Sequence, residues 1–209
     1  MTEPAASRAE QKERTRRAIL DAALELCDDT PLAALSLRQV AKQVGIVPTG
    51  FYRHFASIED LGLALVQESL VSLRAVLRDV RQGGEPEYRA IIDRSVGVLV
   101  DHVRGRRGHF AFIARERTAG PEPVREAIAD GLALFEAELA ADLARLPGTS
   151  PWSAADLRIL SNLIVSAMVA TAERLLSVEP DSPAETQIAH EARTQLRMLM
   201  VGATRWRST

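Results

Sequence analysis

Apolar residues recur with helical spacing along almost the whole chain, and no segment alternates apolar and polar residues in the manner of a strand. Capping signals at Ser36 with Gln39 and at Ser57 with Asp60 indicate helix starts, whereas the DDTP segment at 28–31 and later glycines and prolines indicate helix ends. The pattern predicts an all-α fold of about nine helices. Their expected ranges are about 13–27, 37–44, 48–55, 57–80, 87–104, 109–118, 122–146, 153–177 and 183–205.

The segment 36–61, SLRQVAKQVGIVPTGFYRHFASIEDL, predicts two short helices across a tight turn and the start of a further helix. Gly45 stands where the chain turns, at a position that commonly needs positive φ, and Pro48 suits the first turn of a new helix. The second helix directs Phe51 and Phe55 inward and its small, hydroxyl and cationic residues outward. Such a helix fits the major groove of DNA. The alternative is a pair of packed helices without a DNA role.

The net charge of −2 argues at first against a nucleic-acid partner, but the charge is unevenly distributed. Residues 1–55 carry a net charge of +1, and the remaining residues carry −3. Five basic residues gather at and just before the start of the first expected helix: Arg8, Lys12, Arg14, Arg16 and Arg17. Local placement decides whether basic groups meet phosphates. The cluster is therefore either part of a DNA-binding surface or a solvated N-terminus.

The composition bounds the class of protein. With 209 residues, 46% hydrophobic and 26% charged, the chain is long enough for one large domain or two small ones with a sizeable core. Cys27 is the single cysteine and stands among apolar helical positions, which indicates a buried thiol and a reducing compartment. No apolar run reaches the length of a membrane span, and no signal sequence is visible. These features favour a cytoplasmic protein.

The last two expected helices are distinctive because the first of them, 153–177, is apolar on more than one face. Leu160 and Ile164 lie on one side of it, and Ile159 and Leu163 lie on another. A helix that is apolar around much of its circumference needs cover on both sides. The pattern therefore predicts a homodimer built on a four-helix bundle from the last two helices. The alternative buries both helices within a monomer.

Three short N-terminal helices, a long connecting helix and a larger helical body together resemble the TetR family of bacterial repressors. The resemblance rests on LSLRQVAKQVGIVPTGFYRHFASIEDL, above all on FYRHF at 51–55 followed by Asp60 and Leu61. It implies a helix-turn-helix DNA-binding domain at 1–56 and a ligand-binding and dimerisation domain at 57–209. It also implies a repressor that answers to a small-molecule effector and, as a dimer, binds double-stranded DNA at a pseudopalindromic operator.

A narrower likeness, from about Lys12 to Leu132, is to the branch that represses fatty-acid synthesis and desaturation genes, the FabR and DesT types. The matching segments are VPTGFYRHF at 47–55, DLGLA at 60–64, Glu68 with Ser69, and RERT at 115–118. Members of that branch sense long acyl chains carried on coenzyme A, so the likeness implies a long-chain acyl-CoA effector. Ile58 stands where the family at large often has a basic residue, which the lipid branch also tends to lack.

The resemblance places the third helix in the major groove, where small side chains let the backbone approach the base edges and Thr49 meets a base or a phosphate. Tyr52 and His54 match family positions that clamp phosphates, although His54 is alternatively a helix-packing residue. The expected DNA-binding residues are Arg14, Arg16, Arg17, Arg38, Lys42, Val47, Pro48, Thr49, Gly50, Tyr52, Arg53 and His54.

The body contains enough apolar residues to line an effector pocket, although each of them is equally an ordinary core residue. The expected pocket residues are Val96, Leu99, Phe110, Phe112, Ile113, Arg115, Leu132, Phe135, Leu139, Leu163 and Met168. Two interpretations of Arg115 and Arg117 stay open: they attract the phosphates of coenzyme A, or they form ion pairs with Glu116 and its neighbours.

An enzyme is the alternative from another class, and the sequence carries none of its common motifs. The four histidines show no metal-ligand spacing, and GxSxG, P-loop and dinucleotide motifs do not occur. The sequence therefore predicts no catalytic residue, no metal and no cofactor. The nearer alternative is a TetR-type regulator of an efflux or catabolic operon that senses another hydrophobic molecule. The aromatic content of only 4% and the lack of an evident acidic cage for a cation favour acyl chains over a drug or an aromatic effector.

Overall fold

The computed structural model describes residues 7–81, 88–145, 152–203 and 205–207. Within these ranges the chain forms nine α-helices and one short 3-10 helix, without a strand, so the expected all-α fold is confirmed. The elements are α1 (Arg8–Asp29), η1 (Leu32–Ala34), α2 (Leu37–Val44), α3 (Pro48–Phe51), α4 (Ile58–Arg81), α5 (Tyr88–Gly105), α6 (Arg107–Ala119), α7 (Glu122–Leu143), α8 (Ala154–Leu176) and α9 (Pro183–Ala203).

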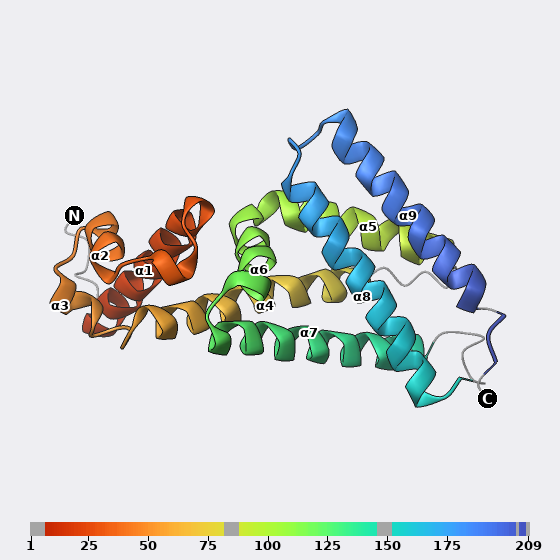
Figure 1. Cartoon of the computed structure of the whole chain (residues 1–209), viewed down its shortest axis with the longest axis horizontal. Helices are drawn as coiled ribbons and strands as arrows, with labels where there is room; N and C mark the ends of the chain where they lie inside the picture. The colour runs from red at the N-terminus through yellow and green to blue at the C-terminus, as the bar shows by residue number, and fades with distance from the viewer. Residues whose placement is uncertain (1–6, 82–87, 146–151, 204, 208–209) are drawn as a thin grey trace.

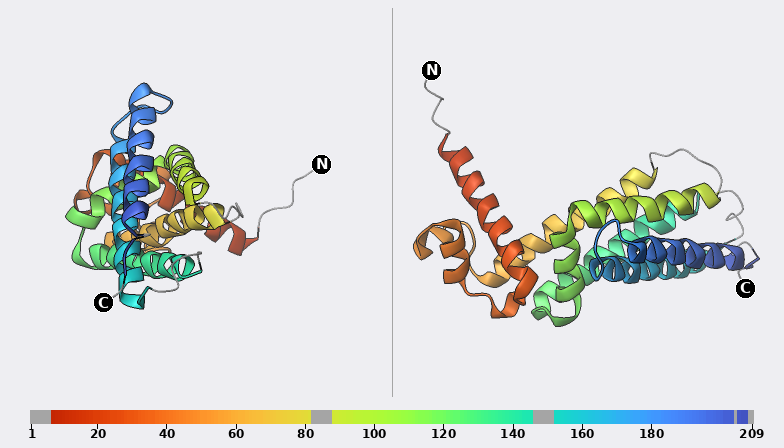
Figure 2. Two further views of the ribbon diagram at one scale, coloured as in Figure 1. Left: turned by 90° about the vertical axis from the view of Figure 1, so that its right-hand side faces the viewer. Right: turned by 90° about the horizontal axis from the view of Figure 1, so that it is seen from above.

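The helices form an elongated molecule with a small head at one end and a larger body (Figure 1). The head consists of α1, α2 and α3, and α4 runs from the head along the body. In the body α8 packs against both α7 and α9, and Figure 2 shows α8 and α9 side by side. α6 lies at the boundary, where it contacts α1 of the head as well as α4, α7 and α8. α4 and α6 therefore join the head to the body.

The first helix begins earlier than the expected residue 13. Ser7 accepts the N–H of Glu10 at 3.2 Å, and the carboxylate of Glu10 accepts the N–H of Ser7 at 2.6 Å. This reciprocal capping box satisfies two backbone donors and starts the helix at Arg8. The basic residues that follow consequently lie on an ordered helix.

The third helix is shorter than the expected range 48–55. α3 ends at Phe51, and the chain continues in tight turns. The N–H of Arg53 bonds the carbonyl of Gly50 at 3.3 Å, and the N–H of His54 bonds that of Phe51 at 2.8 Å. Such i to i+3 bonds wind the backbone more tightly than an α-helix, and the glycine weakens helical continuation.

In the ranges that the structure describes, buried apolar residues form three clusters. The first combines Phe51 and Phe55 of the head with Phe112 of α6 and Ile128 of α7, and the second joins α4, α5, α6, α8 and α9. Phe51 and Phe55 are 0% and 2% exposed, so the expected core role of both rings is confirmed. Because head and body side chains share the first cluster, apolar burial stabilises the two parts together. The division into domains at residue 56 stays a prediction.

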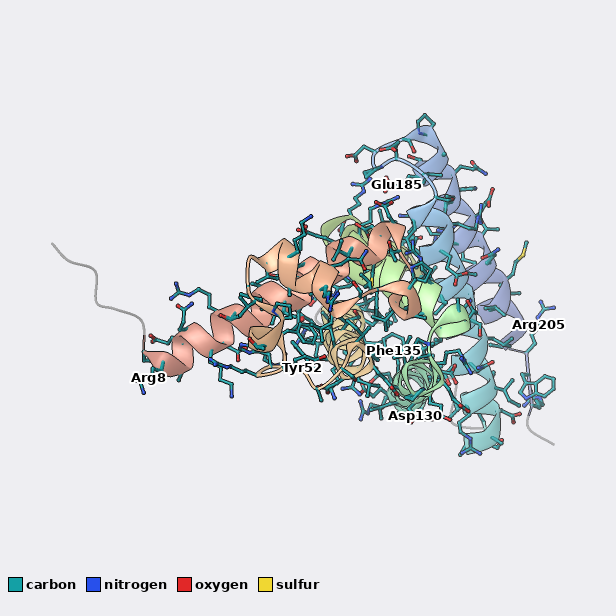
Figure 3. The ribbon with its side chains drawn as sticks, turned by 60° about the vertical axis from the view of Figure 1, so that its left-hand side comes forward. Arg8, Tyr52, Asp130, Phe135, Glu185 and Arg205 are labelled. Carbon is teal, nitrogen blue, oxygen red and sulfur yellow. The ribbon has the colours of Figure 1, made fainter. Side chains whose placement is uncertain are left out.

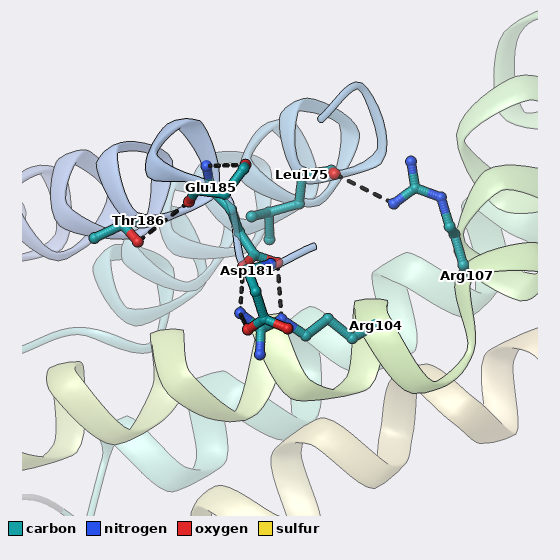
Figure 4. Close-up of polar contacts among 7 residues, drawn as sticks. Arg104, Arg107, Leu175, Asp181, Glu185 and Thr186 are labelled. Carbon is teal, nitrogen blue, oxygen red and sulfur yellow. Dashed lines mark hydrogen bonds and ion pairs between the residues drawn. The ribbon is translucent and has the colours of Figure 1, made fainter. Parts of the chain in front are cut away.

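Polar contacts hold the connection between α8 and α9 against α5 (Figure 4). The guanidinium of Arg104 donates to Glu185 at 2.8 Å and lies 2.8 Å from a carboxylate oxygen of Asp181. Asp181 has a φ of 59°, so the ion pair holds a backbone conformation that residues other than glycine rarely adopt. Arg107 donates to the carbonyl of Leu176 at the C-terminal end of α8. These contacts position the turn from which α9 returns along α8.

α8 is the one helix of the described residues that is long and apolar enough to cross a membrane by length and composition. Its face toward the body includes the buried Leu157 and Leu160, whereas Ile159 and Leu163 are 60% and 47% exposed. The helix is therefore apolar because one face fills the core and a second face stays apolar outside it.

Candidate nucleic-acid interface and internal cavity

Short-range interactions build the helix–turn–helix of the head. The hydroxyl of Ser36 accepts the N–H of Gln39, and the Gln39 side chain accepts the N–H of Ser36, so α2 begins with a capping box. Gly45 ends α2 with a φ of 75°, which a side chain would strain, and the N–H of Ile46 bonds the carbonyl of Ala41 at 2.9 Å. Pro48 then opens α3.

The outer surface of this unit is a compact set of exposed side chains. Val47 and Tyr52 are 67% and 61% exposed, and the Tyr52 ring meets Phe51 edge to face at 6.2 Å between centroids. Gly50 is half-buried, and a Cβ there would meet only ordinary contacts with Ile46 at 3.8 Å or more. The other expected DNA-binding residues of this unit that are exposed are Arg38, Lys42, Pro48, Thr49 and Arg53.

The three arginines expected on α1 have different surroundings. Arg14 is exposed. The guanidinium of Arg16 lies 4.7 Å from the centroid of the Phe55 ring, which ties this cation to the head beside α3. Arg17 forms an ion pair with Glu68 of α4, so its charge is partly neutralised before any phosphate approaches.

His54 is half-buried, and its Nδ1 has no hydrogen-bond partner in the structure as described. Burial lowers the pKa of His54 below its ordinary value, and the neighbouring Lys12 and Arg16 lower it further. The imidazole is therefore neutral at pH 7. A neutral ring donates one hydrogen bond to a phosphate oxygen but brings no charge of its own.

A cavity of about 330 Å³ lies inside the body among α4, α5, α6, α7 and α8. Its wall is mostly apolar, and Figure 3 shows Phe135 on the inner side of α7 with Asp130 on the outer side. The expected pocket residues that line the cavity are Leu99, Phe110, Ile113, Leu132, Phe135, Leu139 and Met168. In volume the cavity falls at the lower end of the range of small-molecule sites.

Four expected pocket residues do not line this cavity. Val96 and Phe112 are buried in the second and first apolar clusters, because each is turned away from the cavity on its helix. Leu163 belongs to the outer apolar face of α8. Arg115 reaches back to the head.

Residues that the sequence patterns did not single out also line the cavity. Ser95 follows Ile91 at helical spacing on α5, and Ala114 follows Ile113 on α6. Arg94 is the cation among the lining residues. Ile91 and Ser95 are four residues apart and so lie on the same face of α5. That spacing could have placed Ser95 on the cavity wall, but a serine on a mostly apolar face does not by itself indicate a pocket.

Two neighbouring residues of α6 bind the head. The guanidinium of Arg115 donates to the carbonyls of Cys27 and Asp28 at the C-terminal end of α1, the second at 2.6 Å. The fully buried Glu116 accepts the N–H of Leu32 in η1 at 3.1 Å. Arg115 is thus engaged by backbone carbonyls and Glu116 by a backbone N–H, and Arg117 pairs with Glu173 of α8 at 2.7 Å. α6 therefore contacts both the cavity and the head.

The described part of the chain shows neither a reactive cysteine nor a cluster of metal ligands. Cys27 is buried, and burial raises the pKa of its thiol to about 12, so the thiol stays protonated. Across the described ranges, His, Cys, Asp and Glu side chains do not gather in a group of three that would hold a metal ion.

Comparison with known proteins decides the family. Residues 19–65 match the bacterial regulatory proteins of the tetR family, and residues 88–202 match the tetracyclin repressor-like C-terminal domain. The chain belongs to the TetR family. It is therefore a DNA-binding, ligand-responsive transcriptional regulator and not an enzyme.

Solved structures share the TetR fold with this chain. A TetR-like transcriptional regulator from Rhodococcus sp. RHA1 is 18% identical, with a TM-score of 0.69 over 94% of this chain and 99% of that one. The transcriptional regulator FadR from Bacillus subtilis, in complex with stearoyl-CoA, is 16% identical, with a TM-score of 0.70 over 89% and 98%. The fatty acid degradation regulator FadR from Bacillus halodurans is 13% identical, with a TM-score of 0.70 over 87% and 94%. At these identities the likeness shows the fold alone.

Proposed function

We propose that this protein is a repressor that binds a pseudopalindromic operator as a homodimer and whose effector carries a long apolar chain, with long-chain acyl-CoA as the candidate. The proposal places the protein with regulators of lipid and fatty-acid genes. The observation that carries it is the mostly apolar cavity of about 330 Å³ beside α6, the helix that also binds the head.

The exposed surface of α2 and α3 supports the DNA-binding part of the proposal. Thr49, Tyr52 and Arg53 project from one short rigid unit whose inner rings are buried, so their positions are preorganised for a groove. Arg38 and Lys42 on α2 supply cations for phosphates. Arg17, with its ion pair to Glu68, is expected to contribute least among the proposed DNA contacts.

The outer apolar face of α8 and α9 supports the homodimer. Ile159, Leu163, Met198 and Trp206 line a common groove there and are each between 47% and 70% exposed. Contiguous exposed apolar surface of this kind marks an interaction site. A second copy, related by a two-fold axis, would cover the same face on both chains and place two heads on two half-sites.

The cavity supports an apolar effector. Aliphatic and phenylalanine side chains from five helices line it, which suits a flexible hydrocarbon chain. The FadR of known structure with stearoyl-CoA shares the fold, which makes an acyl-CoA the first molecule to test. The alternative effector is another hydrophobic small molecule, with control of an efflux or catabolic operon.

Effector binding can change DNA binding only if the effector has unequal affinity for two positions of the head. An effector with equal affinity for both does not shift the equilibrium between them. Ile113 and Ala114 of α6 line the cavity, and the next two residues, Arg115 and Glu116, hold the head. A molecule that displaces this turn of α6 therefore changes the contacts of α1 and η1.

Footprinting on the DNA upstream of the gene tests the operator, with and without stearoyl-CoA and with coenzyme A alone as the control. The expected result is a two-fold symmetric footprint whose affinity changes with stearoyl-CoA and is unaffected by coenzyme A. An asymmetric footprint of one half-site would contradict the dimeric operator complex. If stearoyl-CoA at saturation changes neither operator affinity nor the Tm of the protein, the acyl-CoA effector is wrong.

A further inference from the structure

Two of the three charged side chains that line the cavity have an ion-pair partner. Glu173 is paired with Arg117 at 2.7 Å, and Asp142 lies 3.2 Å from Arg145. Arg94 of α5 also lines the cavity, is exposed, and has neither a hydrogen bond nor an ion pair in the structure as described. A mostly apolar cavity thus carries one unneutralised cation on its wall.

The position of this cation gives the cavity a direction. Arg94 lies in the first half of α5 and Asp142 near the end of α7. Figure 1 shows that these portions of the two helices are the ones distant from the head. The opposite part of the wall is formed by Phe110, Ile113 and Ala114 of α6, beside the head. The one cation among the lining residues therefore lies toward the distal end, together with the paired carboxylate of Asp142, and Phe110, Ile113 and Ala114 give the wall at α6 an apolar surface.

We propose that Arg94 binds the anionic head group of the effector, a carboxylate or a phosphate, while the apolar tail extends along the cavity and ends against α6. This inference rests on the proposed apolar-chain effector and adds its charge and its orientation. The guanidinium offers a planar fork of N–H donors that matches a carboxylate or a phosphate. Because Arg94 is exposed, the charged head group stays hydrated while the tail leaves water.

The orientation gives the tail end a specific role. Ala114 is followed directly by Arg115 and Glu116, whose side chains hydrogen-bond the backbone of Asp28 and Leu32 in the head. A tail anchored at Arg94 reaches this turn only if it is long enough, so chain length sets how strongly the tail presses on α6. The response of operator binding is accordingly expected to depend on chain length more steeply than binding itself.

Calorimetric titration of the full-length protein with laurate, dodecanol and lauroyl-coenzyme A tests the head-group contact. Arg94→Gln is expected to weaken binding of the anionic ligand roughly tenfold and to leave dodecanol binding unchanged, whereas Arg94→Lys retains most of the affinity. Arg89→Gln is the control, because Arg89 is exposed on the same helix but does not line the cavity.

The two anionic ligands distinguish the head groups. Weaker binding of laurate to Arg94→Gln identifies a carboxylate, and weaker binding of lauroyl-coenzyme A identifies a phosphate. Equal binding of both anionic ligands to wild type and Arg94→Gln, or equal losses in Arg89→Gln, would overturn the proposal.

A second variant tests the orientation. Ala114→Leu fills the cavity at α6 and is expected to shift the preferred chain, in a series from octanoate to stearate, shorter by about three carbons, the difference between the two side chains. Arg94→Gln is expected to lower affinity along the whole series without moving the preferred length. An unchanged chain-length preference in Ala114→Leu, with its Tm equal to that of wild type, would overturn the tail's position at α6.

The outcomes separate this inference from the proposed function. If the ligands bind and change operator affinity equally in wild type and Arg94→Gln, the proposed function stands and the role of Arg94 is wrong. If Arg94→Gln weakens binding as expected but no ligand changes operator affinity, the binding site stands and the regulatory function is wrong. If no ligand of the series binds the wild-type protein, both are wrong.

Discussion

The carboxylate of Glu116 accepts the backbone N–H of Leu32 at 3.1 Å, which joins residues 84 positions apart in the chain. Glu116 is fully buried, and it lies on the helix that contributes Ile113 and Ala114 to the cavity wall. The bond therefore fastens the cavity helix to η1 in the head.

Removal of this acceptor is expected to destabilise the protein. In Glu116→Ala the N–H of Leu32 is left unpaired inside the core, which costs about 2 kcal/mol of unfolding free energy. Glu116→Gln keeps an acceptor oxygen and is expected to lose less. Urea unfolding followed by circular dichroism measures both variants, and wild-type stability of the alanine variant would contradict a structural role for the bond.

Two glycines of long helices are expected to respond oppositely to alanine. At Gly62 of α4 a Cβ would lie 2.4 Å from the side chain of the fully buried Leu32, so Gly62→Ala overpacks the core and costs about 1–3 kcal/mol. At Gly97 of α5 a Cβ would meet nothing within 4 Å, so Gly97→Ala stabilises the helix by up to about 1 kcal/mol. Thermal unfolding shows whether each variant has a higher or a lower Tm than wild type. A higher Tm for Gly62→Ala would show that the packing at η1 is loose.

A charge on the outer face of α9 is expected to separate the proposed dimer. Met198 is 70% exposed in the single chain, so Met198→Glu leaves the folded chain intact but places a carboxylate in the interface. Val71→Glu is the control, since Val71 is 60% exposed on α4, away from that face. Sedimentation velocity is expected to show monomers for Met198→Glu and dimers for Val71→Glu. Dimers in both variants would place the interface elsewhere.

A phosphate contact from α2 is expected to appear in the salt dependence of operator binding. Lys42→Gln should weaken binding to specific and non-specific DNA alike and reduce the slope of log K against log salt by about 1. Arg78→Gln removes an exposed cation from the body and is expected to leave the slope unchanged. Fluorescence anisotropy at several salt concentrations measures both slopes, and identical slopes for wild type and Lys42→Gln would remove Lys42 from the interface.

Acid is expected to destabilise the contact between α4 and α6. Burial lowers the pKa of His109, whose Nδ1 lies 3.1 Å from the hydroxyl of Ser69. Because the pKa is lower in the folded than in the unfolded protein, the stability contribution is complete above about pH 6.5 and declines as the pH falls toward the folded pKa. Unfolding free energies from pH 8 to 5 should therefore fall more for wild type than for His109→Gln, and parallel curves would refute a neutral imidazole at this half-buried position.

The helix-turn-helix was predictable because its signals act over a few residues. The Ser36–Gln39 capping box, the positive φ of Gly45 and the start of α3 at Pro48 are all found where the sequence indicates them. The end of α3 was misplaced, because the tight turns after Phe51 place Phe55 in the core without a continuous helix. The early start of α1 followed from Ser7 and Glu10, a capping box outside the clear apolar repeat.

The sequence by itself determined the all-α fold, the buried rings of the head and the two apolar faces of α8, because helical periodicity and capping are local properties of the chain. The tertiary structure decided which apolar residues line the cavity, since Leu99 and Val96 are both buried apolar residues of α5 and only Leu99 lines it. It also decided the partner of Arg115, whose bond to the carbonyl of Cys27 spans 88 residues. Such contacts depend on how distant helices pack, and no local pattern records that packing.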